Sequence, residues 1–145
     1  MLLRDDTQMA ISQVETLCIE SADHYAVAAE KAGDATLAKL FVELAHARRE
    51  LAAALARHIR AGDDLPQPPD PDKVAVGEVL ADIKGWLSGD ARSVLIGQRE
   101  RDEESLAEAV RSALGHEMET GMRSTLQDIL AHAEAAKGKL AALHA

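Results

Sequence analysis

The stretch from residue 34 to residue 60 holds the two features of this sequence that bear most directly on chemistry. Glu43 and His46 have the Glu-x-x-His spacing with which four-helix bundles bind metal ions. Arg48 follows two residues later, within a run of apolar residues at helical spacing. Whether the Glu-x-x-His pair or the arginine faces the interior decides between a metal site and a bundle without one.

The apolar pattern predicts that Arg48 points inward and that the Glu-x-x-His pair points to solvent. An α-helix turns about 100° per residue, so residues three and four apart share a face. Arg48 lies within about 20° of the centre of the apolar stripe, Glu43 about 120° from it, and His46 nearly opposite. Metal ligands in a bundle must point inward, so we interpret the pair as solvated surface residues. The stripe consists of Leu37, Leu40, Phe41, Leu44, Leu51, Leu55 and Ile59.

Composition restricts the class of protein. A length of 145 residues suits one domain, and we expect residues 1–145 to form it. Apolar residues make up 47% of the chain and aromatic residues only 2%, which is typical of alanine- and leucine-rich helices. The net charge of -9 argues against binding to nucleic acid or to an anionic membrane surface.

The sequence also predicts a cytoplasmic location. It contains no run of about 18 apolar residues, so we expect no transmembrane helix. The first ten residues lack the apolar segment of a signal peptide. Cys18 is the single cysteine, which fits a reducing compartment, and its place beside an apolar stripe predicts a buried thiol.

Helical periodicity predicts four long helices. Glycines and acidic capping residues mark their ends, as at Gly33, Asp34 and Gly115. The connections are short between the first two helices and between the last two, which makes the members of each pair antiparallel neighbours. The expected helices cover residues 6–32, 34–60, 91–114 and 117–143.

The connection between the second and third long helices is long. Its first part, residues 62–72, contains four prolines and is expected to be extended. Residues 73–87 are expected to form a short extra helix. We therefore expect an all-α, ferritin-like four-helix bundle of two antiparallel helical hairpins, joined by a Pro-rich crossover over residues 62–90.

A buried polar network is predicted from the inward faces of these helices. Arg48 and Arg99 both project toward the interior, and so does Glu103. Because a buried guanidinium needs a partner, we expect Arg48 to pair with Glu103, with the Tyr25 hydroxyl as a second partner and His132 joining from the last helix. The alternative is that the two arginines lay their stems on the core and keep their charged ends in water.

The region over residues 98–114 resembles the third helix of an uncharacterised family of bacterial ferritin-like four-helix-bundle proteins. That family tends to have Cys-Glu-Arg-Gly-Glu-Asp here, and the matching residues are Glu100, Arg101, Glu103 and Glu104. Arg99 and Asp102 depart from it. Further agreement lies at Cys18, Tyr25, Glu30, Leu40, Phe41, Arg48 and His132. Ser21 stands where glycine is common, and Trp86 is displaced from the usual tryptophan. The resemblance implies a ferritin-like fold and leaves the biochemical role undefined.

Other candidate sites are weaker. Asp128 and His132 are four residues apart, but Ile129 occupies the position that a Glu-x-x-His pair needs. Serine nucleophile elbows, glycine-rich phosphate loops and CxxC pairs are absent from the sequence. We therefore expect no catalytic residue, no metal ligand and no cofactor.

These features favour a non-enzymatic bundle that acts by association, as a homodimer or with a protein partner that the sequence does not identify. A first alternative is a diiron or iron-handling ferritin-like protein, which the fold and the Glu43/His46 pair would support. A second alternative is a carrier that holds a small apolar ligand within the bundle.

Overall fold

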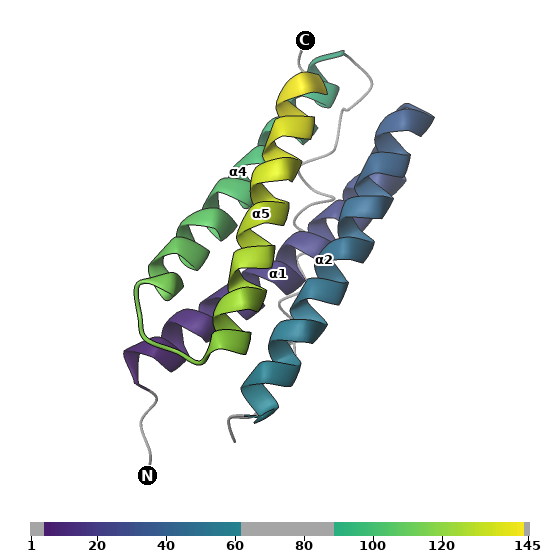
Figure 1. The fold of residues 1–145 in the computed structure, drawn as a ribbon. Coiled ribbons are helices and arrows are strands. Elements are labelled where there is room, and N and C mark those ends of the chain that lie inside the picture. Colours follow the sequence, from purple (N-terminus) through teal and green to yellow (C-terminus); the bar gives the residue numbers. More distant parts are fainter. Residues whose placement is uncertain (1–4, 62–88, 144–145) are drawn as a thin grey trace.

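A computed structural model of the protein describes residues 5–61 and 89–143, which fold into four α-helices without a strand. The all-α class with four long helices is therefore confirmed. The expected crossover lies outside the described residues except for its last two, and the short helix expected over residues 73–87 lies wholly outside them. The helices are α1 (Asp6–Lys31), α2 (Ala35–Ala61), α4 (Gly89–Leu114) and α5 (Thr120–Leu143) (Figure 1).

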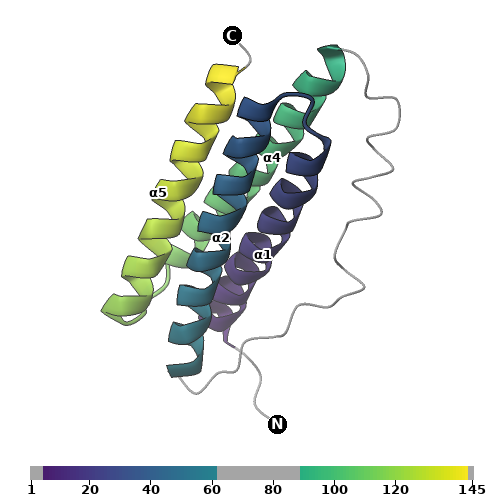
Figure 2. The same ribbon diagram turned by 90° about the vertical axis from the view of Figure 1, so that its right-hand side faces the viewer.

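The four helices lie side by side at the corners of a square. Helix α1 contacts α2 and α4, and α5 contacts α4 and α2. One apolar cluster joins the first half of α1 to the second halves of α2 and α4 and the first half of α5. The other cluster joins the remaining halves. Helices α2 and α4 therefore run in the same direction, and α1 and α5 run opposite to them (Figure 2).

Side chains cap the starts of α1 and α2 as expected from the sequence. The backbone N–H of Gln8 donates to the Asp5 side chain at 2.7 Å, and the backbone N–H of Asp5 donates to the Gln8 side chain at 3.0 Å. At the start of α2, the Leu37 amide donates to Asp34 Oδ1 at 2.7 Å. Both helices thus begin where an acidic side chain satisfies a backbone N–H that has no partner within the helix.

The turn between α4 and α5 differs from the expectation. Helix α5 begins at Thr120, not near residue 117. The guanidinium of Arg123 donates to the carbonyl oxygens of Leu114 at 3.1 Å and His116 at 2.8 Å. These bonds satisfy carbonyl groups at the end of α4 and hold the chain in a turn before α5 starts.

The interior is divided into two apolar clusters with polar side chains between them. On α1, Cys18 belongs to the first cluster and Tyr25 to the second, and Ser21 lies between them. The second cluster includes an aromatic pair, Tyr25 and Phe41, with ring centres 5.6 Å apart. Within the described residues, no helix has the length and apolarity that crossing a bilayer requires.

Candidate functional site

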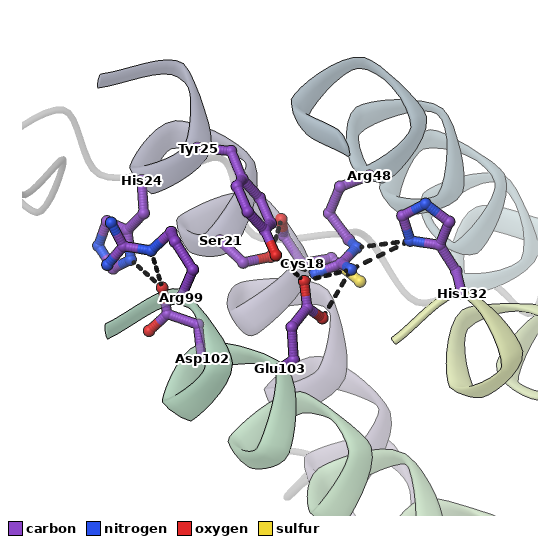
Figure 3. A network of polar contacts seen from close by, with 9 residues as sticks. All are labelled: Cys18, Ser21, His24, Tyr25, Arg48, Arg99, Asp102, Glu103 and His132. Carbon is purple, nitrogen blue, oxygen red and sulfur yellow. Dashed lines mark hydrogen bonds and ion pairs between the residues drawn. The ribbon is translucent and has the colours of Figure 1, made fainter. Parts of the chain in front are cut away.

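Arg48 and Glu103 form an ion pair at the centre of the bundle. Both side chains are 0% exposed. Arg48 Nη2 donates to Glu103 Oε1 at 2.7 Å and to Oε2 at 2.9 Å (Figure 3). The predicted pairing of these two residues is therefore confirmed, and Arg48 does not keep its charged end in water. The amphipathic pattern of α2 places the arginine here, because it falls in the middle of the apolar stripe.

Helix α1 supplies two further partners. Arg48 Nη1 donates to Ser21 Oγ at 2.8 Å, and Ser21 Oγ donates to the Cys18 carbonyl oxygen at 3.1 Å. The Tyr25 hydroxyl donates to Glu103 Oε2. The guanidinium carbon of Arg48 lies 6.0 Å from the centre of the Tyr25 ring, at the outer limit of a cation–π contact. The hydroxyl of Tyr25 thus binds the anion of the pair, and its ring faces the cation.

His132, on α5, is a further partner of Arg48. Its Nδ1 lies 3.3 Å from Arg48 Nε and 3.0 Å from Arg48 Nη2. Because a guanidinium can only donate, Nδ1 accepts, and the neutral ring carries its proton on Nε2. Burial and the neighbouring Arg48 charge, with a smaller effect of Lys139, lower the pKa of His132 from 6.5 to about 4. We call Ser21, Tyr25, Arg48, Glu103 and His132 the polar layer; all four helices contribute to it.

The electrostatics of the polar layer keep its proton donors protonated. Burial raises the pKa of Tyr25, and the Glu103 carboxylate raises it further. Burial likewise raises the pKa of the neighbouring Cys18 thiol to about 12. For Glu103, burial raises the pKa and outweighs the opposing effects of Arg48 and Tyr25. At neutral pH the layer therefore offers no phenolate as a nucleophile, and the neighbouring Cys18 offers no thiolate.

Arg99 lies in a second polar cluster, which is formed by residues of α1 and α4. It is buried, as its place on the helix predicts, with 4% of its surface exposed. Its Nε donates to Asp102 Oδ2 at 3.0 Å, and His24 Nδ1 lies 2.9 Å from the same oxygen. Arg99 is predicted to lie with Arg48 and Glu103, whereas its partner in the structure is Asp102, the carboxylate one turn along its own helix. The i, i+3 spacing of Arg99 and Asp102 is the signal for this pairing.

The sequence interpretation also missed Ser21 and His24. The Ser21 hydroxyl is not among the predicted partners of Arg48, and no role is predicted for His24. Its partner, Asp102, is 78 residues away along the chain, so only the packing of α1 against α4 brings the two together.

The Glu-x-x-His pair faces solvent, as predicted. Glu43 and His46 are both exposed. His46 Nε2 lies 3.1 Å from Glu50 Oε1 on the same helix, and these side chains are 76% and 72% exposed. In residues 5–61 and 89–143, no three His, Cys, Asp or Glu side chains come together in a way that could hold a metal ion.

Comparison with curated proteins and with solved structures finds no match. A family model matches residues 6–116, more than half of the chain. The match includes Ser21, Tyr25, Arg48 and Glu103 and ends before α5, which carries His132. The chain therefore belongs to the family described as "Domain of unknown function (DUF2383)".

Proposed function

We propose that this protein is a ferritin-like four-helix bundle that acts by association, as a homodimer or with another protein, and not through a metal centre. The supporting observation is the buried Arg48–Glu103 ion pair. Ferritin-like metal sites are built from carboxylate and histidine side chains that project into the bundle from its helices. Here the guanidinium of Arg48 lies in the interior and binds both oxygens of the Glu103 carboxylate. The positive charge of this guanidinium would repel a divalent cation.

The direction of the helices supports the ferritin-like assignment. Helices α2 and α4 run in the same direction, so the end of α2 and the start of α4 lie at opposite ends of the bundle. Ferritin-like folds have this arrangement, with one long crossover between two antiparallel hairpins. The four prolines of residues 62–72 favour an extended crossover between α2 and α4.

Association is supported because Arg48, Glu103 and Tyr25 of the polar layer are closed to solutes. Arg48 and Glu103 are fully buried, and Tyr25 is 0% exposed as well. A substrate could not reach these groups without opening the bundle, so the surface is where recognition takes place. Among the residues that the structure describes, the exposed large apolar side chains are Met9, Val42 and Val94. A cytoplasmic location is part of the proposal and is supported by the single, buried Cys18.

The first experiment measures bound metal. Untagged protein is incubated anaerobically with Fe(II), Mn(II) and Zn(II), desalted, and analysed by elemental mass spectrometry. We expect a metal content close to zero. Two metal ions per chain would overturn the proposal in favour of a diiron protein, and the variant Glu43→Ala/His46→Ala would then test whether the pair on α2 is the ligand.

The second experiment measures association. Sedimentation velocity across micromolar concentrations is expected to show a dimer, or a larger complex when a partner is present. A protein that stays strictly monomeric and captures no partner would overturn the association that we propose. The metal result and the sedimentation result are independent, so each part of the proposal can fail separately.

A further inference from the structure

The second polar cluster, formed by His24, Arg99 and Asp102, lies on the seam between α1 and α4. The side chains of His24 and Asp102 are 21% and 25% exposed, whereas the side chain of Arg99 is only 5% exposed. The cluster therefore reaches the surface through His24 and Asp102, while Arg99 is almost wholly buried. Figure 3 shows the three side chains together, apart from Arg48. It is separate from the polar layer, because the inward carboxylate of Glu103 is bound by Arg48 and Tyr25.

Arg99 has a hydrogen-bond donor that its neighbours do not satisfy. Its Nη1 is buried, and among the described residues it is the one buried side-chain nitrogen or oxygen without a hydrogen-bond partner. Nε of the same guanidinium is bonded to Asp102. Buried polar groups in native proteins are nearly always hydrogen-bonded, since an unmade bond is costly. An acceptor that reaches Nη1 would therefore be favourable.

The charges of the cluster favour an anionic acceptor. A single oxygen, Asp102 Oδ2, contacts both Arg99 and His24. A guanidinium recognises carboxylate and phosphate groups through its paired N–H donors, and a charge-assisted bond of this kind is stronger than a bond to water.

We propose that this seam binds the carboxylate or phosphate group of a small anion. Arg99 Nη1 donates the main hydrogen bond, and His24 borders the site where the seam meets the surface. Asp102 contacts both side chains through Oδ2 and holds them in place. The proposal concerns the outer seam of α1 and α4, and it does not depend on whether the protein associates.

The test is a titration with inorganic phosphate and, separately, with acetate, at constant ionic strength set by sodium chloride. Saturable shifts of the His24 ring signals in NMR spectra, and a rise in the melting temperature, are expected with at least one of the two anions. Arg99→Met should abolish the saturable shifts. Arg101→Met is the matched control, because Arg101 is exposed on the same helix two residues away and should leave the response unchanged.

His24→Asn provides a second variant in case Arg99→Met unfolds the protein. It keeps Arg99 and removes the imidazole ring that contacts Asp102, so the affinity for the anion should fall several-fold while Arg99 still binds. Absence of any saturable response to both anions at millimolar concentrations would overturn the proposal. An equal response in Arg99→Met, or a crystal structure grown in phosphate that has an ordered water at Nη1, would overturn it as well.

Discussion

Replacing Arg48 with alanine is the most informative perturbation of this protein. The substitution removes two hydrogen bonds to Glu103, one to Ser21 and the contact with His132. Glu103 would keep its hydrogen bond from the Tyr25 hydroxyl while its side chain remains 0% exposed. Breaking a buried ion pair by removing one member costs about 3–5 kcal/mol, because the other charge is left buried. We expect the free energy of unfolding to fall by about that amount.

The loss in Arg48→Ala should also depend on pH. Burial raises the pKa of Glu103 above its ordinary value of 4.5, and removing the Arg48 charge takes away the main opposing effect. A carboxyl group with a raised pKa in the folded state favours folding below its unfolded value and loses that contribution as pH rises through the folded value. The destabilisation should therefore be smaller near pH 4.5 than at neutral pH.

Urea unfolding followed by circular dichroism measures both effects. Arg49→Ala is the matched control, because Arg49 is 53% exposed and lies 3.7 Å from Asp23 in a surface ion pair. The free energy of unfolding of Arg49→Ala should fall by no more than about 0.5 kcal/mol. The double variant Arg48→Met/Glu103→Leu should recover most of the stability, since it replaces both charges with apolar side chains.

Two outcomes would refute this reasoning about the ion pair. A loss below about 0.5 kcal/mol in Arg48→Ala would mean that Arg48 contributes no more than a surface arginine. A double variant that is as unstable as the single variant would mean that the side chain of Arg48 matters for packing and not for neutralising Glu103.

Three further predictions concern single positions. Stability should fall as pH drops from 6.5 toward about 4, because the folded protein holds His132 neutral until its pKa of about 4. The shift in the pKa of His132 corresponds to a loss of stability of at most about 3 kcal/mol, which the partial exposure of the ring reduces to about 1–2 kcal/mol. An NMR pH titration that compares His132→Gln with the control His46→Gln assigns the effect to His132 or refutes it. Cys18, buried with a pKa of about 12, should react with a thiol reagent only at the rate of unfolding, whereas fast labelling of native protein would contradict its burial. Asp5→Ala should cost about 1 kcal/mol in urea unfolding through loss of the capping box, and an unchanged midpoint would show that the start of α1 is frayed.

The sequence was sufficient to place side chains on faces of helices. Arg48 and Glu103 are both inward by helical periodicity, and their pairing follows because a buried cation needs an anion. Glu43 and His46 are outward by the same periodicity. These predictions succeeded because the 3.6-residue repeat is a strong signal in long helices.

The sequence was not sufficient to choose between neighbouring partners. Arg99 has Asp102 and Glu103 at i+3 and i+4, and both spacings bring side chains together on a helix. The choice of Asp102 depends on His24, which α1 brings across the seam. The start of α5 was missed for a similar reason, because Arg123 folds back onto the end of α4 from within the next helix.

The polar layer has a consequence for the order of folding. Its bonds join residues that are 27, 55, 78 and 84 positions apart in the chain, and each helix contributes at least one member. A partly folded form with only α1 and α2 docked would bury Arg48 without Glu103, which is unfavourable. The layer should therefore form after the transition state for folding, so that weakening it accelerates unfolding and leaves the folding rate nearly unchanged. We therefore expect few stable intermediates between the unfolded and the native state of this protein.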